Sequence, residues 1–556
     1  MSTRARRLAA VPADPNAVRP ATREETLPVG LLALVAGLIA LSISALHGDM
    51  LLYGDAVAHL GIARRLVDTN APGLMQLGGV WLPLPHLLML PFVWKMEWWQ
   101  NGMAGAWPSL ICYVVGAMGM YRLARRLMPP RWALVATAFF GLNANLLYLS
   151  TTAMTEPLFL ALLVWIVVLL LELLAAIQAV RSSVATSRLI LLGVLIFAAT
   201  MTRYDGWVLG AGVWSIAAWH VLHARELQRK LAPFFLLFTL LVAAGPISWL
   251  VYNHVYAHDW LDFMRGPYSA KEIDRRTSPP GSRHYFGWHD PAWSLMLYAR
   301  TAQVDAAAWE TGWLVAAMAL WGGWQTVRGT TPRASLMLWL PLPFYVYSVS
   351  YGSVPIFIPQ IYPNSFYNSR YGMEMLPAFA IFATITLAAL LQRLGRAQAL
   401  ALRLAMPVAL MLIVVNLFWM LHSVPLVLHE AMVNSIGRIA LEEPLAQSIE
   451  TFPRGATILM ETSAHIGALQ KAGFPLRQTI GPDDYYGWHR GMAVPADVAS
   501  YVVASAGDAV SKAIAAHPEG LTELTIFCTT HQPCVRIYHS DRFQNGPHGS
   551  QPSISP

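Results

Sequence analysis

The chain has 556 residues, of which 56% are hydrophobic and 12% are charged, and its formal net charge is +7. Soluble domains carry charge on about a quarter of their residues, so this composition excludes an ordinary soluble protein and indicates a polytopic membrane protein. The positive charge does not indicate nucleic-acid binding, because the arginines cluster in short connections between apolar runs.

The chain opens on a polar segment. Residues 1–28 are rich in Arg, Ala and Pro and lack apolar periodicity, so we predict a disordered cytoplasmic tail. The apolar run that follows, LPVGLLALVAGLIALSISALH, is long enough to span a bilayer. No A-x-A cleavage site follows it, which favours a first transmembrane helix over a cleaved signal peptide.

A span requires about 20 apolar residues, and about eleven segments meet this requirement. They lie near 29–47, 103–121, 132–150, 156–180, 187–202, 206–222, 231–254, 305–326, 334–351, 371–391 and 403–425.

The charges of the loops between the predicted spans predict the membrane topology. With the N-terminus in the cytoplasm, the connections expected there are YRLARRLMPPRW, AVRSSVATSR, HARELQRK, TVRGTTPR and LQRLGRAQALALR, and all are basic. The outer side then receives a long first loop, 48–102, the loops 255–304 and 352–370, and everything after residue 428.

The character of the chain changes near its C-terminal end. We predict a transmembrane domain over 29–428, an extracytoplasmic α/β domain over 429–545, and a disordered tail over 546–556. Cys528 and Cys534 stand in CTTHQPC within the outer domain. An oxidising compartment allows a disulfide there, and a metal site that includes His531 is the competing interpretation.

Polar residues gather at the outer ends of the predicted spans. A charge near the hydrocarbon costs roughly 2.5–3.5 kcal/mol even on mild scales, and such charges usually line a cavity. Four clusters at one membrane level therefore favour one outward-facing site. They are Asp49, Asp55 and His59 after the first span, Glu156 in TTAMTEPLF, Arg203 and Asp205 in MTRYDGW, and Arg370 and Glu374 in YNSRYGMEM.

Each of these residues also has a purely structural explanation. Asp55 could cap the next helix, and Glu156 could begin one. Arg203 and Asp205 could pair with each other, and Arg370 could snorkel to the interface. Their joint placement is what favours a functional site.

The outer loops differ in composition. IARRLVD and VWLPLPHLLMLPFVW in the first loop are typical of helices that lie in the membrane interface. The basic segment RGPYSAKEIDRRTSPPGSR, which contains Lys271, is either a surface for a lipid phosphate or a solvated loop. The aromatic 352–370 loop is either a lid over a sugar or prenyl chain, or an interface loop.

These features together resemble the GT-C membrane glycosyltransferases, and most of all the branch with dolichyl-phosphate-mannose protein mannosyltransferases and bacterial aminoarabinose transferases. The stretches that carry the resemblance are YGDAVAH, WLPLPHLL, TEPLF, TRYDGW and NSRYGMEMLP, within residues 30–425. The resemblance implies an enzyme of a bacterial inner (plasma) membrane that uses a polyprenyl-phosphate-linked sugar as donor.

The resemblance also implies roles for residues. The family acid of the first outer loop, which is the general base or orients the acceptor, corresponds to Asp55, and transfer would invert the anomeric carbon. Arg203 or Arg370 would stabilise the leaving phosphate. Many relatives have two adjacent acids here, whereas this chain has Asp55-Ala56, and its nearest second acid is Asp49.

The resulting candidate site contains both catalytic and substrate-binding residues. The catalytic candidates are Asp55, His59 and Glu156, and the substrate-binding candidates are His86, Arg203, Tyr204, Asp205, Lys271, Arg370 and Tyr371. We assign no metal ligand and expect no cofactor, although dependence on a divalent metal stays open. The expected partners are the membrane, the lipid-linked donor and a lipid, glycan or protein acceptor, and not nucleic acid.

Two rival functions stay open at this stage. One is a transporter or flippase for a lipid-linked saccharide, although transporters place charge near the bilayer midplane and often contain repeated halves. The other is a non-catalytic assembly protein. The sequence identifies neither the sugar nor the acceptor.

Overall fold

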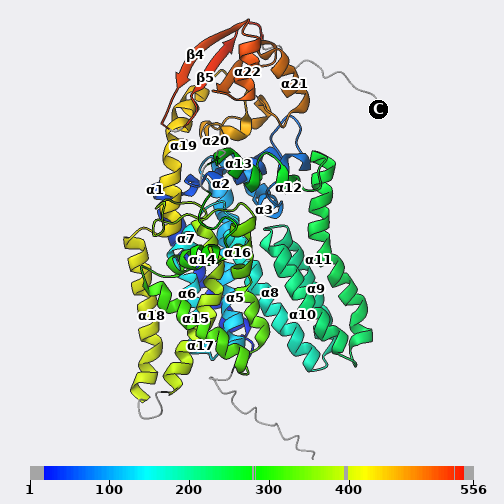
Figure 1. Cartoon of the computed structure of the whole chain (residues 1–556), viewed down its shortest axis with the longest axis vertical. Helices are drawn as coiled ribbons and strands as arrows, with labels where there is room; N and C mark the ends of the chain where they lie inside the picture. The colour runs from blue at the N-terminus through cyan, green and yellow to red at the C-terminus, as the bar shows by residue number, and fades with distance from the viewer. Residues whose placement is uncertain (1–17, 279–280, 282–283, 394–398, 531, 544–556) are drawn as a thin grey trace, which may run out of the picture.

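The computed structural model describes residues 18–278, 281, 284–393, 399–530 and 532–543. A long bundle of helices carries a smaller domain with a β-sheet at one end (Figure 1). The predicted fold class, a polytopic helical membrane protein with a small C-terminal α/β domain, is confirmed. The predicted tail over 546–556 lies outside the described residues.

Seven helical segments of the described chain are long and apolar enough to cross a membrane. Five of them are single helices: α1 (Arg23–His47), α5 (Met103–Leu127), α8 (Glu156–Gln178), α9 (Ser182–Thr200) and α11 (Gln228–Ala257). The sixth, Ser369–Arg393, joins η4 (Ser369–Met375) to α17 (Leu376–Arg393). The seventh, Leu404–Glu450, contains most of α18 (Ala399–His422) and all of α19 (Leu426–Glu450).

The other four predicted spans are not among these seven segments; three of them correspond to short or interrupted helices, and the fourth to α10 (Asp205–His223), which is as long as α9. The three are α6 (Pro130–Gly141) with α7 (Ala144–Leu149), α14 (Pro291–Ala306) with α15 (Thr311–Arg328), and η3 (Arg333–Trp339) with α16 (Pro341–Tyr351). At the first interruption, Asn143 caps α7 by accepting a hydrogen bond from the backbone N–H of Leu146. The number of eleven spans stays a prediction.

Helix α1 begins earlier than its predicted span. Thr22 and Glu25 form a capping box, in which each side chain accepts a hydrogen bond from the other residue's backbone N–H. The helix therefore starts at Arg23, inside the segment predicted to be disordered.

Small residues let the central helices pack closely. A Cβ added to Gly37 of α1 would lie 2.3 Å from Cδ1 of Leu110 on α5. One added to Gly119 of α5 would lie 2.6 Å from Nε1 of Trp165 on α8. Small residues at such crossings are how membrane helices gain van der Waals contact without a hydrophobic driving force.

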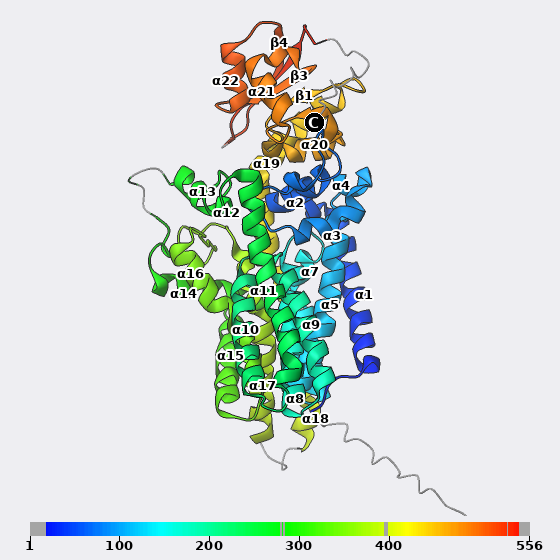
Figure 2. The same cartoon turned by 90° about the vertical axis from the view of Figure 1, so that its right-hand side faces the viewer.

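Short helices of the outer loops lie between the bundle and the sheet domain in both views (Figures 1 and 2). The first loop forms η1 (Asp49–Leu51), α2 (Gly54–Arg65), η2 (Leu74–Leu77), α3 (Leu84–Val93) and α4 (Met96–Gln100). The 255–304 loop forms α12 (Asp262–Arg265) and α13 (Ala270–Thr277).

The sheet domain follows α19, which runs out of the bundle without a break. Its sheet has the order β2-β1-β3-β5-β4, parallel among β2, β1 and β3 and antiparallel among β3, β5 and β4. The strands are β1 (Ile458–Leu459), β2 (Thr479–Ile480), β3 (Tyr501–Ser505), β4 (Leu521–Phe527) and β5 (Val535–Ser540), and the helices are α20 (Ile466–Ala472), α21 (Tyr485–Ala493) and α22 (Ala509–Ala516).

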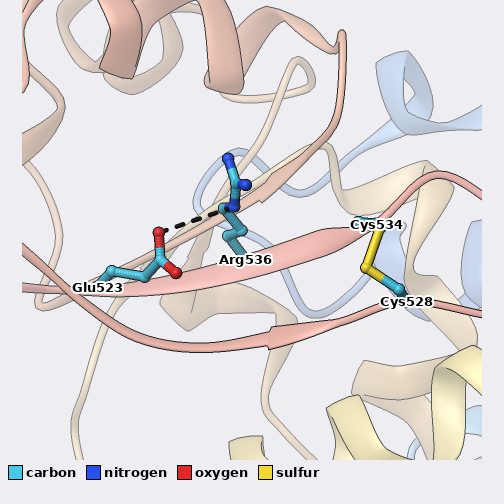
Figure 3. Close-up of a disulfide and its surroundings, with 4 residues drawn as sticks. All are labelled: Glu523, Cys528, Cys534 and Arg536. Atoms are coloured by element: carbon cyan, nitrogen blue, oxygen red, sulfur yellow. Dashed lines mark ion pairs between the residues drawn. A yellow bond between two sulfur atoms is a disulfide. The ribbon is translucent and has the colours of Figure 1, made fainter.

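The last two strands form a hairpin that a disulfide closes. Cys528 and Cys534 are joined to each other at the turn end of β4 and β5, and Glu523 pairs with Arg536 across the same strands (Figure 3). The two sulfurs therefore form the disulfide, which was one of the two interpretations of CTTHQPC. His531, the third residue of the metal interpretation, lies outside the described residues.

The sheet domain contacts helix α2. A Cβ added to Gly61 of α2 would lie 2.5 Å from the Ile466 side chain of α20. Arg65 donates to the Ser463 hydroxyl at 3.0 Å, and Arg438 of α19 donates to the carbonyl of Leu51 at 2.7 Å. The outer domain and α19 thus fix the position of the helix that bears Asp55.

Candidate active site

A cavity of about 500 Å³ lies at the end of the bundle that carries the sheet domain. We refer to this end as the outer end, after the predicted topology. Segments far apart in the sequence form its wall: α2, the loop before α3, the starts of α8 and α10, helices α12, α13 and α16, and η4. Nine of the ten predicted site residues line it: Asp55, His59, Glu156, Arg203, Tyr204, Asp205, Lys271, Arg370 and Tyr371. The tenth, His86, contacts His59 instead.

Asp55 is not a helix cap. Helix α2 begins at Gly54 after the extended residue Tyr53, so Asp55 lies in the first turn. Its Oδ2 atom accepts a charge-assisted hydrogen bond from Nη2 of Arg370 at 2.5 Å. The Asp55 side chain is 38% exposed, so the carboxylate is held in place and still open to the cavity.

Arg370 is buried and does not snorkel to the surface. Besides Asp55, its guanidinium pairs with Glu156 at 3.1 Å and with Glu430 of α19 at 3.5 Å. Glu430 also accepts from the backbone N–H of Asn368 at 3.0 Å and that of Ser369 at 2.7 Å. The start of η4 is therefore tied to α19.

Arg203 occupies the connection between α9 and α10 and makes a second set of ion pairs. Its guanidinium lies 3.2 Å from Glu156, 3.3 Å from Asp205 and 3.1 Å from Glu374. It also donates to the Tyr345 hydroxyl at 2.6 Å, and that hydroxyl donates to Glu374 at 2.7 Å. The pair of Arg203 and Asp205 is thus one part of a larger network.

Glu156 joins the two arginines. Both guanidiniums reach its Oε1 atom, while its buried Oε2 has no hydrogen-bond partner among the described residues. Two cations therefore face five carboxyl groups: Asp55, Glu156, Asp205, Glu374 and Glu430. The side chains of the other four are at most 5% exposed, so Asp55 is the one of the five that a substrate can reach.

An aromatic wall holds the arginines. The guanidinium carbons of Arg203 and Arg370 lie 5.1 and 5.0 Å from the centre of the Tyr371 ring. Tyr345 stacks on Tyr371 at 5.1 Å. Cation–π contacts of this kind contribute more when they are desolvated, so the wall favours one fixed arrangement of the two cations.

His59 lies one helical turn after Asp55 and is paired with His86. Nδ1 of His59 and Nε2 of His86 share a hydrogen bond of 2.8 Å, and the Trp81 ring lies 4.5 Å from the His59 ring. Burial, together with Arg370 and Arg203, lowers the pKa of His59 to about 3. Both rings are buried and His59 is neutral at physiological pH, which makes it a hydrogen-bonding group for an uncharged partner.

Lys271 of α13 differs from the other cations of the cavity. Arg203 and Arg370 are bound to carboxylates, whereas Lys271 has no ion pair within the described part of the chain. Phe263 and Met264 of α12 line the cavity beside it, and Phe263 stacks on Tyr204 at 4.9 Å. This side of the cavity combines one available positive charge with an apolar surface.

Sequence reasoning missed several residues of the site. Glu430 stands in VLHEAMV, where a lone acid on an apolar helix is a usable signal of a buried partner. Glu374 belongs to the predicted cluster with Arg370, but it is not one of the ten predicted site residues. Tyr345 lies in PLPFYVYSVS and offers no signal, because aromatic residues are common at any span end.

No three His, Cys, Asp or Glu side chains converge to hold a metal ion within the described residues. The carboxylates of the cavity neutralise guanidiniums instead. The expectation that the protein needs no cofactor stays a prediction.

The architecture, a bundle of continuous and interrupted helices with a sheet domain at the end that holds the carboxylate-bearing cavity, is similar to that of solved structures. The structure of ArnT from Cupriavidus metallidurans bound to undecaprenyl phosphate matches with a TM-score of 0.56 and 15% identity, covering 93% of this chain and 98% of that chain. The apo structure of the same ArnT matches with a TM-score of 0.52 and 15% identity, covering 91% and 97%.

These likenesses show a shared fold, and they confirm the resemblance to the GT-C proteins at that level. No protein-family model and no curated protein matches the sequence.

Proposed function

We propose that this protein is an integral membrane glycosyltransferase that moves a sugar from a polyprenyl-phosphate-linked donor to an acceptor on the outer face of the membrane. The observation that carries the proposal is the partly exposed carboxylate of Asp55, held by Arg370 in the wall of a cavity that also contains Lys271. The ArnT structure of the same fold is bound to undecaprenyl phosphate.

In the proposed reaction Asp55 is the general base. The acceptor hydroxyl gives its proton to the free oxygen of Asp55 while its own oxygen attacks the anomeric carbon. The bond from that carbon to the phosphate oxygen breaks in line, so the configuration inverts and the lipid phosphate leaves. Positioned proton transfer of this kind contributes roughly 10²–10⁴-fold to a rate.

The structure favours Lys271 over the two arginines as the cation for the leaving phosphate. A guanidinium that already neutralises carboxylates has little charge to offer, and the carboxylates around it would repel a phosphate. Arg203 and Arg370 then act as positioning residues, and so does Glu156, which is fully buried between them.

The remaining cavity residues suit the sugar and the lipid. Neutral His59, fixed by His86, can bond a sugar hydroxyl. The rings of Trp207, Tyr347 and Tyr351 line the cavity where α10 and α16 face it, and the exposed Tyr347 ring suits an approaching prenyl chain. Amphipathic rings of this kind are favoured at the membrane interface.

We propose a bacterial inner-membrane location with the N-terminus in the cytoplasm and the sheet domain outside. The basic connections support this orientation, and the disulfide between Cys528 and Cys534 suits an oxidising compartment. A reporter fused after residue 430 should be active only outside the membrane. Activity of that fusion in the cytoplasm would contradict the orientation.

The glycolipid and glycan profile of cells tests the function. Cells with an inactive copy should accumulate the lipid-linked sugar and lack the sugar on its acceptor, which identifies donor and acceptor together. An unchanged profile would contradict the proposal. Accumulation of the intact lipid-linked sugar on one leaflet only would favour the flippase instead.

A further inference from the structure

The end of the bundle opposite the sheet domain carries a dense group of arginines. They lie just before and at the start of α1, in the last turns of α5 and in the second turn of α9, where these helices pack beside α8. The group is Arg19, Arg23, Arg122, Arg125, Arg126 and Arg188. We refer to this end as the inner end.

Two glutamates neutralise four of these six arginines. Glu25 pairs with Arg19 at 2.9 Å and with Arg125 at 3.8 Å. Glu172 of α8 pairs with Arg126 and with Arg188. Each carboxylate pairs with two guanidiniums, and neither pairs with the remaining two arginines within the described residues.

Arg23 and Arg122 are the two that remain. Neither has an ion pair among the described residues, and both line a cavity of about 420 Å³ between α1, α5 and α8. The guanidinium carbon of Arg122 lies 5.3 Å from the centre of the Trp165 ring. Glu24, the nearest other acid in the sequence, is exposed and does not line this cavity.

Apart from the buried Thr26, the rest of the lining is apolar. Leu27, Met118 and Trp165 also line the cavity, together with the two arginines. Leu27 is 46% exposed and Leu31, one turn further into the membrane, is 64% exposed, because α1 lies at the edge of the bundle beside α5 (Figure 2). The cavity therefore offers positive charge at the level of the headgroups and an apolar wall toward the hydrocarbon.

We infer that this cavity binds an anionic phospholipid of the inner leaflet, with the phosphate between Arg23 and Arg122 and an acyl chain along Leu27, Met118 and Trp165. Guanidinium groups match the geometry of phosphate oxygens and bind them bidentately. The apolar wall distinguishes a lipid from a free phosphate, which would leave that wall in contact with water. The inference is independent of the proposed catalytic function.

Native mass spectrometry of the full-length protein tests the inference. Released from mixed vesicles, the wild type should retain phosphatidylglycerol in preference to phosphatidylcholine. Arg23→Gln with Arg122→Gln should lower that retention roughly fivefold per arginine, since each basic residue near an anionic surface contributes about that much. Arg181→Gln is the matched control, because Arg181 is exposed near the same end and does not line the cavity.

Three results would overturn the inference that the cavity binds an anionic lipid. Equal loss in the Arg181 variant, or none in the double variant, would overturn the inference. Equal retention of the two lipids by the wild type would also overturn it, and that comparison suffices if the double variant does not fold. A soluble glycerol phosphate that displaces the bound lipid at equal concentration would show a free-phosphate site instead.

Discussion

The two ends of the helical bundle treat charge in opposite ways. At the outer end five carboxyl groups surround two arginines, whereas in the arginine group of the inner end two glutamates pair with four of the six arginines. The outer cations are thereby saturated and fixed, whereas the inner end keeps two guanidiniums available.

This difference separates two uses of arginine in one membrane protein. At the outer end arginine is an internal counter-ion that positions the carboxylates, and Asp55 is the one of them left open to the cavity. At the inner end we predict that arginine sets the topology, and we propose that it offers charge to a lipid. The following experiments test this difference between the two ends.

The largest effect is expected from Asp55→Asn. The variant keeps the shape of the side chain and loses the base, so transfer should fall by about 10³-fold. The protein should stay folded, because Arg370 keeps its ion pairs with Glu156 and Glu430. Asp49→Asn is the matched control, because Asp49 follows the same span and does not line the cavity. A radiolabelled transfer assay measures both, and near-normal turnover in Asp55→Asn would remove Asp55 as the base.

Removal of Arg370 should destabilise the outer end. Arg370→Ala leaves Asp55, Glu156 and Glu430 without this cation, and breaking a buried ion pair typically costs about 3–5 kcal/mol. Arg300→Ala should cost much less, because its partner Glu310 is 69% exposed and solvent screens the pair. Equal losses in chemical unfolding of the two variants would contradict the description of Arg370 as an internal counter-ion.

Acid should weaken the outer end through His59. The folded pKa is about 3 against an ordinary value of 6.5, so the unfolded state binds the proton first as the pH falls below 6.5. Stability is complete above that pH and declines toward pH 3. At pH 5 the loss is about 2 kcal/mol.

The His59→Gln variant sharpens this test. It should flatten the decline between pH 7 and pH 5, as measured by unfolding at each pH. A pH profile that is the same with and without His59 would show that other groups cause the decline.

The smallest effect is expected from Lys271. Lys271→Ala should raise the KM for the lipid-linked donor about tenfold with little change in kcat, since one charge-assisted hydrogen bond is worth roughly 1.5–3 kcal/mol. Lys271→Arg should restore binding. Arg275→Ala is the control on the same helix, because Arg275 is already paired with Glu272. An unchanged KM would return the phosphate role to the arginines.

Much of the fold could be predicted from the sequence, because apolar length and loop charge act locally. The long spans, the interfacial helices of the first loop and the outer α/β domain follow from such signals. The interruption at Asn143 and the start of α1 at Arg23 depend on single capping interactions, which hydropathy does not resolve.

The site was predictable in part for a similar reason. Charges near the hydrocarbon are costly and usually line a cavity, so the joint placement of Asp55, Glu156, Arg203 and Arg370 at one membrane level indicated a site. Their pairing could not be predicted, because it depends on contacts such as that between Arg370 and Glu430, which join distant segments.

The missing acidic neighbour of Asp55 illustrates the same limit. In the sequence the nearest second acid is Asp49, whereas in the fold Glu156 and Glu430 share Arg370 with Asp55.

The proposed sugar transfer can be tested by measuring what happens to the lipid-linked donor. Purified protein in vesicles is given a polyprenyl-phosphate-linked sugar with an acceptor-containing membrane extract, and mass spectrometry measures the lipid products. We expect free polyprenyl phosphate to appear in a one-to-one ratio with glycosylated acceptor, and Asp55→Asn to abolish both products. Donor that stays intact, or that only moves between leaflets, would contradict it.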